Sequence, residues 1–417
     1  MEAMEIQADK ATFRSYLFFW SGQLVSLLGS SVAQFVIIWW ITLETESALY
    51  LAIASLLGFA PMVILTAFAG VLVDRWSRKA LIGVVDFLQA LATVVLIFLF
   101  WSDSVLIWQV LVILALRGTF QAFHTPAVSA IIPVMVPKPK LSRINGLNYL
   151  FSGAVTLIGP VVAALLLVLW RIDQILWIDA GTFLVAVIPL LMIKIPSVRM
   201  KQDKSSFGKD FMEGLAFIKD GRGFLPLLMM ATAVNFLLTP FSTLLPYYVK
   251  FDHLGDAPDL ALVMAFFQGG ILAGGLLMSV IKGFKNKMVA ITSAIYIIFL
   301  GYALVALTPT GLFWFMAIGG SVMAFCVPVA NVATQTIIQT VVPMKMQGRV
   351  NSVTMALASA ATPLGMILSG VIVEFTRTAN LFLGCAGLGI LVLTISWVFT
   401  DIRHVEKIEE TPAHAKG

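Results

Sequence analysis

Ionisable side chains are rare within the long apolar runs of this 417-residue sequence, so the few that occur there are the groups that could do chemistry. A charged group in an apolar medium is costly to bury, and it therefore has a partner or a role in moving ions. A carboxyl group in such a place can exchange protons near neutral pH. We identify four candidates for coupling to protons, namely Asp86, Arg117, Asp179 and Glu374.

The positions of these groups within the apolar runs predict different roles for them. Asp86 and Arg117 fall at similar depth on consecutive predicted helices, so the two can form an ion pair from which protonation of Asp86 would release Arg117. The alternative for both is a structural contact that ties helices together. Glu374 falls near the end of its apolar run. His124 lies near the end of another run and is interpreted as a structural histidine with satisfied partners.

A short basic segment follows the second apolar run and reads Gly70-Val-Leu-Val-Asp74-Arg75-Trp-Ser-Arg78-Lys79. A glycine such as Gly70 lets a second helix approach closely. Asp74, at a helix boundary, can accept hydrogen bonds from backbone N–H groups at the start of a neighbouring helix. Arg75, Arg78 and Lys79 can bind carboxylates or the carbonyl groups at helix C-termini. The segment is therefore predicted to be a gating loop.

The fifth apolar run contains Gly153, Gly159 and Pro160 in the pattern G-x-x-x-x-x-G-P. Glycine permits close packing between membrane helices, and proline bends a helix. We therefore expect this run to be a closely packed and bent helix.

The composition predicts that the elements holding these residues cross a membrane. Of the 417 residues, 59% are apolar and 12% are charged, which is about half the charged share of soluble domains. This balance excludes ordinary soluble enzymes, disordered proteins and secreted disulfide scaffolds. One helical span takes roughly 20 apolar residues, so the sequence accommodates twelve spans. We place them at 13–43, 48–73, 80–101, 104–127, 143–169, 173–194, 223–249, 258–281, 288–308, 310–340, 350–375 and 379–400.

Basic residues indicate how these spans are oriented. Of the 27 Lys and Arg residues, 23 fall on one side of the predicted bundle. The exceptions are Arg117, which lies within a span, and Arg171, Lys250 and Arg377. Connecting segments rich in Lys and Arg stay in the cytoplasm. We therefore expect a multi-pass protein with both termini in the cytoplasm.

The two halves of the chain resemble each other, which indicates an internal duplication. A constant offset carries Pro137, Arg143, Asn145 and Gly159 onto Pro343, Arg349, Asn351 and Gly365. We expect residues 1–194 to form an N-terminal six-helix half and 223–401 a C-terminal six-helix half. Residues 195–222 are expected to be a cytoplasmic linker and 402–417 a loose cytoplasmic tail. Parallel repeats of this kind place a cavity at their interface near the bilayer midplane.

Taken together, these motifs resemble those of the major facilitator superfamily over nearly the whole chain. The segment from Gly70 to Lys79 resembles the loop signature of the superfamily, and Arg117 with Gln121 resembles its R-x-x-x-Q pattern. The segment from Gly153 to Pro160 resembles the antiporter motif of drug–proton exchangers. Within the superfamily, the chain is similar to the bacterial macrolide-efflux group.

The resemblance implies an all-α membrane protein with twelve transmembrane helices in two six-helix pseudo-symmetric halves. It also implies a location in the cell membrane of a bacterium and export of amphipathic compounds, driven by the proton gradient through alternating access.

Polar and aromatic side chains within the spans are the candidates for lining a substrate cavity. Amide groups can hydrogen-bond an amphipathic substrate, and aromatic rings form apolar walls. The candidates are Gln23, Gln34, Phe35, Phe120, Gln121, Asn148, Asn235, Phe241, Gln268, Asn331 and Gln335.

Three functions remain open from the sequence. The first is a proton-coupled exporter of amphipathic small molecules, the second a lipid, lysolipid or siderophore transporter of the same fold, and the third a membrane sensor or scaffold that does not transport. Because the sequence contains neither a nucleotide-binding loop nor metal-ligand spacing, we expect no enzyme activity, catalytic residue, metal or cofactor. Cys326 and Cys385 are interpreted as small hydrophobic side chains. The expected partners are a small amphipathic substrate, protons and membrane lipids, with no nucleic acid, for a monomeric protein.

Overall fold

Long α-helices account for nearly all of the chain that the structure, a computed structural model, describes, namely residues 10–196, 207–221, 223–281 and 283–407. Within these residues, twelve helices of at least 20 residues coincide with the twelve predicted spans, so the predicted all-α membrane protein is confirmed. Eleven of the twelve have the length and apolar composition needed to cross a membrane. The other helix, α4 (Ile107–Ser129), is less apolar because it carries Arg117, Gln121 and His124.

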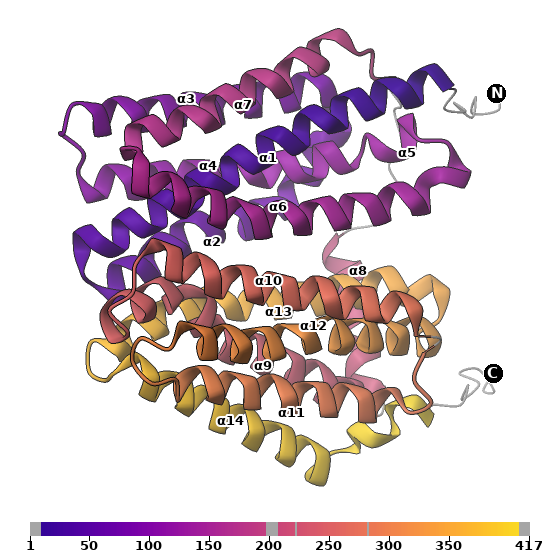
Figure 1. Cartoon of the computed structure of the whole chain (residues 1–417). Helices are drawn as coiled ribbons and strands as arrows, with labels where there is room; N and C mark the ends of the chain where they lie inside the picture. The colour runs from indigo at the N-terminus through magenta and orange to yellow at the C-terminus, as the bar shows by residue number, and fades with distance from the viewer. Residues whose placement is uncertain (1–9, 197–206, 222, 282, 408–417) are drawn as a thin grey trace, which may run out of the picture. The chain divides into compact units, whose positions relative to one another are not determined.

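The helices form two compact units. Figure 1 shows the chain coloured from indigo at the N-terminus to yellow at the C-terminus. The first unit contains α1 (Lys10–Thr45), α2 (Ala48–Arg75), α3 (Arg78–Trp101), α4, α5 (Ile132–Met135), the short 3-10 turn η1 (Lys138–Lys140), α6 (Leu141–Leu169) and α7 (Ile172–Met192). The second unit contains the remaining helical elements, except that Val249–Phe251 and Gly255–Ala265 are grouped with the first unit. These elements are α8 (Phe207–Asp220), α9 (Phe224–Tyr247), the π-turn η2 (Tyr248–Asp252), α10 (Ala257–Val280), α11 (Lys287–Ala306), α12 (Phe313–Val341), α13 (Met344–Val373), α14 (Thr378–Phe399) and the 3-10 segment η3 (Asp401–Lys407).

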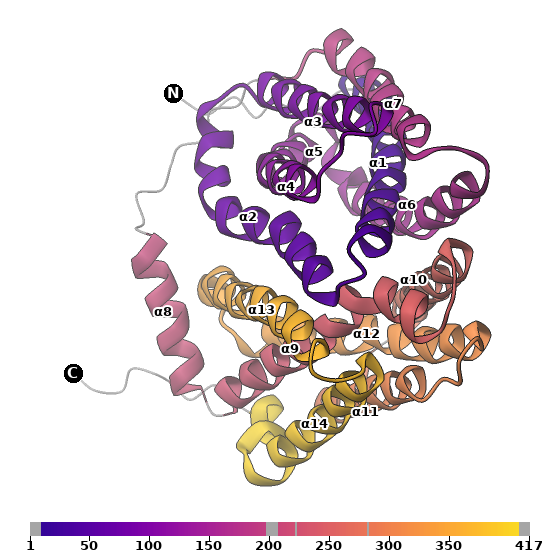
Figure 2. The ribbon, with the colours of Figure 1, turned by 90° about the vertical axis from the view of Figure 1, so that its left-hand side faces the viewer.

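In the first unit, α1 packs against α6 and α7, while α4 packs against α2 and α3, as the view along the helices shows (Figure 2). Two buried apolar clusters hold these helices together. One cluster includes Tyr16 on α1 and Ile82 on α3. The other includes Ile37 on α1 and Leu96 on α3. The middle of α1 and α3 lies between the two clusters, and this is where the polar residues of the unit are found.

Aromatic rings form the core of the second unit. Phe241 on α9 lies at ring-centroid distances of 5.7 Å from Tyr302 on α11 and 6.1 Å from Phe382 on α14. Tyr248 stacks on Phe382 at 5.0 Å, and its hydroxyl donates to the carbonyl of Val305 at 3.1 Å. Phe241, Tyr248, Tyr302 and Phe382 are all buried. The packing centre of this unit is therefore largely apolar.

The internal repeat is visible in how equivalent helices pack. A Cβ atom added at Gly159 on α6 would lie 2.1 Å from Oγ of Ser31 on α1. At the equivalent Gly365 on α13, a Cβ atom would lie 2.9 Å from Cβ of Thr239 on α9. Equivalent glycines thus allow the same close approach of two helices in each unit.

Two segments depart from the sequence expectations. The predicted linker contains an amphipathic helix, α8, in which Gly214 and Ile218 are buried against α13 and α9. Polar residues dominate the interval as a whole, and this concealed the short apolar face. The predicted loose tail begins with η3, whose Ile402 and Val405 are buried. The rest of that tail, 408–417, lies outside the described residues.

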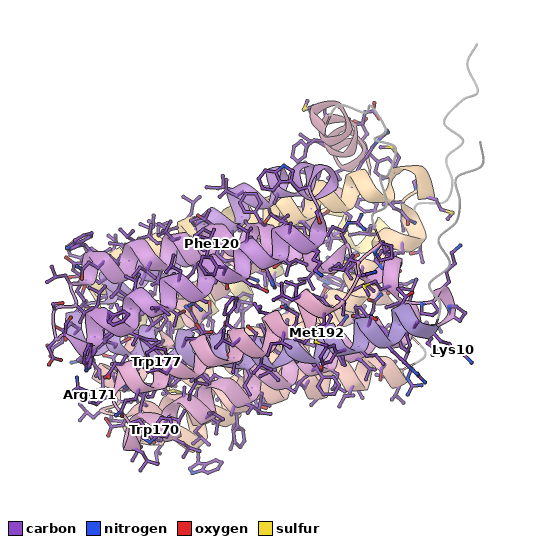
Figure 3. The ribbon with its side chains drawn as sticks, turned by 90° about the horizontal axis from the view of Figure 1, so that it is seen from above. Lys10, Phe120, Trp170, Arg171, Trp177 and Met192 are labelled. Atoms are coloured by element: carbon purple, nitrogen blue, oxygen red, sulfur yellow. The ribbon has the colours of Figure 1, made fainter. Side chains whose placement is uncertain are left out.

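The two ends of the first unit differ in composition. Most of the exposed tryptophans lie at one end, where Figure 3 labels Trp170 and Trp177 beside Arg171, whereas Trp76 lies at the other. Lys10 marks the opposite end in the same view. Tryptophan prefers the boundary between membrane and water, because its ring is apolar and its N–H is polar. The exposed rings therefore fit a helix bundle that ends at a membrane surface.

The contact between α2 and α4 gives a stability prediction. A Cβ atom at Gly118 would lie 2.3 Å from the carbonyl oxygen of Gly58, whereas a Cβ atom at Gly58 meets nothing within 4 Å. We expect Gly118→Ala to lower stability by about 1–3 kcal/mol, because the backbone of α2 must move. Thermal unfolding of the detergent-purified protein measures the effect, with Gly58→Ala as the matched control. Equal melting temperatures for the two variants would contradict this packing.

Candidate functional site

Polar side chains form a ladder between α3 and α4 in the middle of the first unit. On α3 they follow the spacing i, i+3, i+7, and on the antiparallel α4 the spacing i, i+4, i+7, so each set occupies one face of its helix. Three pairs meet across the helices: Asp86 with His124, Gln89 with Gln121, and Thr93 with Arg117. The central pair is a hydrogen bond of 3.3 Å from Gln89 Nε2 to Gln121 Oε1.

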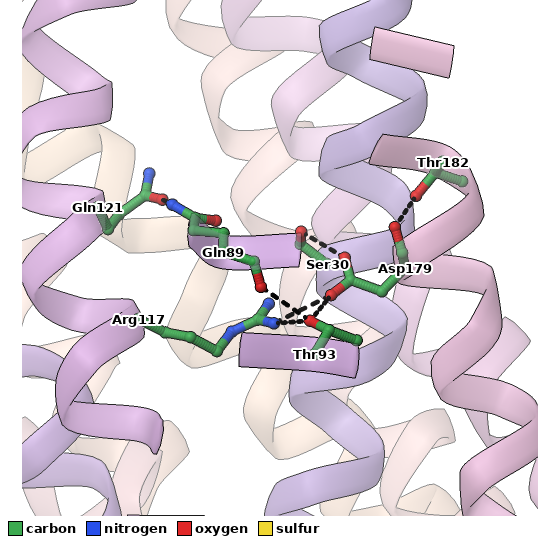
Figure 4. A network of polar contacts seen from close by, with 7 residues as sticks. All are labelled: Ser30, Gln89, Thr93, Arg117, Gln121, Asp179 and Thr182. Carbon is green, nitrogen blue, oxygen red and sulfur yellow. Dashed lines mark hydrogen bonds and ion pairs between the residues drawn. The ribbon is translucent and has the colours of Figure 1, made fainter. Parts of the chain in front are cut away.

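One end of the ladder closes on a buried ion pair (Figure 4). Arg117 Nη1 lies 3.0 Å from Oδ2 of Asp179 on α7, and the two side chains are only 11% and 8% exposed. The same Oδ2 accepts a hydrogen bond of 2.6 Å from Thr93, and Oδ1 accepts one of 2.8 Å from Ser30 on α1. Four helices therefore meet at one carboxylate, whose charge is fully compensated.

The other end of the ladder opens into a cavity. Nε2 of His124 lies 2.9 Å from Oδ1 of Asp86, and Gln23 on α1 donates to Oδ2 of Asp86 at 3.2 Å. Although His124 Nε2 is close to the carboxylate, its N–H does not point along a hydrogen bond to any acceptor. The contact is thus a close approach of two titratable groups and becomes a full ion pair when the imidazole is protonated.

The cavity has a volume of about 390 Å³ and lies within the first unit. It is bounded by α1, α3, α4 and α6, together with Ile132 of α5. Amide, hydroxyl and aromatic groups make up most of its wall, including Tyr16, Trp20, Ser30, Asn145 and Asn148. Asn148 also donates to the hydroxyl of Tyr16 at 3.4 Å. Such a mixture suits a ligand that has both apolar and hydrogen-bonding parts.

The expected pair of Asp86 with Arg117 is contradicted. Arg117 instead contacts Asp179, and Asp86 contacts His124 and Gln23. The two ladder positions are separated by Gln89 and Gln121, which is about two helical turns along α3. Depth estimated from sequence could not resolve this separation. Glu374, the remaining coupling candidate, is exposed at the C-terminal cap of α13.

The gating-loop residues bind helix ends within the first unit. Nη1 of Arg78 donates to the carbonyl of Ala130, the C-cap of α4, at 3.1 Å. Nζ of Lys79 donates to the carbonyls of Leu191 and Ile193 at the end of α7, at 2.8 and 2.7 Å. Both contacts agree with the predicted binding of basic side chains at helix C-termini. The side chains of Gly70, Asp74 and Arg75 lie outside the described part of the chain.

The helix with the antiporter-type pattern, α6, runs unbroken through Gly153, Gly159 and Pro160. Gly159 and Pro160 are buried where α6 contacts α1, whereas Gly153 lies half-buried one and a half turns earlier, nearer to the cavity residues. The pattern thus fixes the packing of a helix that forms part of the cavity wall.

The predicted cavity residues fall into several groups. Gln23, Gln121 and Asn148 line the cavity of the first unit. The structure places Phe35 in the buried core and Phe120 against an apolar cluster, and Gln34 is exposed. In the second unit, Phe241 belongs to the aromatic core, Gln268 is half-buried, and the exposed amides are Asn235, Asn331 and Gln335. The relation of these second-unit residues to a substrate stays a prediction.

Sequence reasoning missed the residues that complete the site. His124 was interpreted as structural, and Ser30, Gln89 and Thr93 were not singled out. A signal for them was present, because Gln89 and Thr93 lie three and seven residues after Asp86 and therefore share its helix face. Ser30 in turn lies seven residues after Gln23 on α1.

Comparisons with known proteins find relatives over nearly the whole length. The family model described as Major Facilitator Superfamily matches residues 19–318 and 283–416. Macrolide efflux protein A of Streptococcus pyogenes is 30% identical over 393 residues, which cover 94% of this chain and 96% of that protein. Multidrug efflux pump Tap of Mycolicibacterium fortuitum is 26% identical over 381 residues, covering 87% and 89%.

A solved structure shares the fold. The bacterial homologue of the iron transporter ferroportin aligns with a TM-score of 0.72 at 15% identity, over 92% of this chain and 98% of that chain. At this identity, the likeness concerns the helix arrangement alone.

The buried ion pair gives a second stability prediction. Arg117→Met leaves Asp179 charged in an apolar interior, so we expect a loss of roughly 3–5 kcal/mol. The double variant Arg117→Met/Asp179→Asn removes both charges. The amide keeps one acceptor oxygen for Ser30, and its NH2 group can donate to the hydroxyl of Thr93, which can in turn donate to the Gln89 carbonyl. We therefore expect it to melt close to the native protein in detergent. A double variant as unstable as Arg117→Met would show that the ion pair is not the source of the effect.

Proposed function

The chain belongs to the major facilitator superfamily, and from this we propose that it exports amphipathic small molecules of the macrolide or multidrug type. It is a membrane transporter related to efflux pumps and not an enzyme. The observation that carries the proposal is the cavity of the first unit, where one carboxylate lies in a wall otherwise rich in amides, hydroxyls and aromatic rings. The relationship to Macrolide efflux protein A supports the direction and the class of substrate.

Proton coupling is the second part of the proposal, and we assign it to the cavity end of the ladder, where Asp86 lies. Asp86 borders the cavity, where water and substrate can reach it. Asp179, in contrast, accepts hydrogen bonds from Ser30 and Thr93 and contacts Arg117, so all of its charge is already compensated. A group that exchanges protons with the solvent must be accessible from it, which favours the cavity end of the ladder over the buried ion pair.

Alternating access is the third part. The two repeats would move relative to each other around a fixed substrate site, with the segment Gly70 to Lys79 as the gate. The basic residues at the ends of the spans support a topology with both termini in the cytoplasm. We propose a monomer as the transporting form, located in a bacterial cell membrane.

Drug accumulation in cells tests the export proposal. Cells that express the chain should retain less erythromycin or ethidium than control cells, and a protonophore should abolish the difference. Asp86→Asn should raise retention to the level of cells without the protein, because the neutral amide removes the negative charge of the cavity wall. Asp103→Asn is the matched control, since the side chain of Asp103 is 84% exposed at the other end of α3.

The outcome of this assay separates the three readings of the sequence. Native protein in the membrane without efflux of either compound would reject drug export and favour a lipid or siderophore substrate, or a function without transport. Efflux that persists with the protonophore would reject proton coupling but would leave the export proposal in place.

The gating loop gives a separate prediction. Asp74→Asn should stop efflux while the protein still inserts into the membrane in normal amount, because the neutral side chain binds the N-terminus of a helix more weakly. Efflux is measured as above, and insertion by immunoblotting of membranes. Normal efflux by this variant would remove the gate assignment from Asp74.

A further inference from the structure

His124 is a buried titratable side chain for which the proposed transport cycle has so far no use. It lies on α4 at the cavity end of the ladder, with its side chain 17% exposed beside Asp86, which is 9% exposed. Its Nε2 atom has no hydrogen-bond partner in the described chain, although Oδ1 of Asp86 is only 2.9 Å away. The imidazole is therefore held against a carboxylate without being fixed by a hydrogen bond.

The surroundings of His124 leave Asp86 as the charge that it faces. On the cavity side, α1 contributes Gln23 and the phenol of Tyr16, and α6 contributes the neutral amides of Asn145 and Asn148. On α3 and α4, the next ladder pair is formed by two glutamines. Arg117 is committed to Asp179 at the far end of the ladder. Asp86, His124 and Tyr16 are thus the titratable groups in the cavity wall.

We propose that the imidazole of His124, and not the carboxyl of Asp86, carries the exchanged proton, and that Asp86 remains ionised as its counter-ion. The inference rests on the proposed function and names the group that takes up the proton in it. Histidine is the side chain that ordinarily changes charge between about pH 5 and 8. Each oxygen of the Asp86 carboxylate has a neighbour that can donate a hydrogen bond, since Oδ1 faces the imidazole and Oδ2 accepts from Gln23.

The charge of the cavity wall then changes by one unit each time His124 takes up or releases a proton. With His124 neutral, Asp86 gives the wall one negative charge, which attracts a cation. With His124 protonated by a proton from the cavity water, the pair is neutral and the attraction disappears. The substrate class that fits is an amphiphile with a protonated amine, which binds Asp86 after the imidazole has returned its proton to water. One cation is exchanged for another at a single pair, which is the requirement for antiport.

Replacing His124 by side chains of fixed charge tests this assignment. The measurement is uptake of ethidium by proteoliposomes at a series of pH values between about 5 and 8, with and without a pH gradient. Native protein should show a one-proton titration and respond to the gradient. His124→Gln, which is always neutral, should bind ethidium at all these pH values and lose the response to the gradient. His124→Lys, which is always charged, should bind it weakly throughout.

A buried histidine in the second unit provides the matched control. His253, which follows η2, is 4% exposed, and burial lowers its pKa although the charge of Asp252 and a hydrogen bond to the Pro309 carbonyl act in the opposite direction. His253 therefore stays neutral over most of the range tested. His253→Gln should leave the pH profile and the response to the gradient unchanged.

Infrared difference spectra of the native protein provide a test that does not depend on folding of a variant. Acidification should produce imidazolium bands. It should not produce a carboxylic-acid carbonyl band from Asp86, which would be recognised as a band present in the native protein and absent from Asp86→Asn. Such a carbonyl band would overturn the proposal, because the proton would then be on Asp86. An unchanged pH profile in His124→Gln would also overturn it, whereas absence of ethidium transport by native protein would instead reject the export proposal.

Discussion

The ion pair between Arg117 and Asp179 is the interaction on which the first unit depends. A guanidinium and a carboxylate in an apolar interior are stable only when each compensates the other and their remaining hydrogen-bonding atoms find partners. Ser30 and Thr93 supply those partners, so α1, α3, α4 and α7 all contribute to one charge centre. Because the charges of Arg117 and Asp179 compensate each other at this end of the ladder, the helix bundle can stay stable while the other end holds the less completely paired carboxylate of Asp86 at the cavity.

The two repeats have kept a common scaffold but have different centres. Glycines at equivalent places bring α6 onto α1 and α13 onto α9. The first unit has an ion pair and a polar ladder between its apolar clusters, whereas the second has the rings of Phe241, Tyr302 and Phe382. The groups able to exchange protons inside the helices are thus concentrated in one repeat. The centre of the other repeat is formed by aromatic rings, and its buried His253 lies at the edge of that centre, beside Tyr248.

The sequence predicts the helices well because each span requires a long apolar run, and such runs are visible without any tertiary information. It also predicts that Arg78 and Lys79 bind helix ends, since a basic side chain at a helix boundary has few other partners there. The partner of Arg117 could not be predicted, because depth estimated from the sequence did not separate Asp86 from Asp179, which lie about two helical turns apart along the ladder. For the same reason, the contact of His124 with Asp86 required the register between α3 and α4. Helix α8 was missed because its seven apolar residues stand among charged ones in a segment that is polar overall, which gives a weak signal.

Lys79 and Arg78 have a mechanical consequence beyond their role in a loop. They fasten the first turn of α3 to the last carbonyls of α7 and α4, while the middle of α3 is fastened to the same two helices through Thr93. A helix attached at two heights cannot tilt or slide independently of its neighbours. In the proposed alternating-access cycle, α3, α4 and α7 would therefore move together. The distance between Asp86 and His124 would then stay the same while the exposure of the cavity changes.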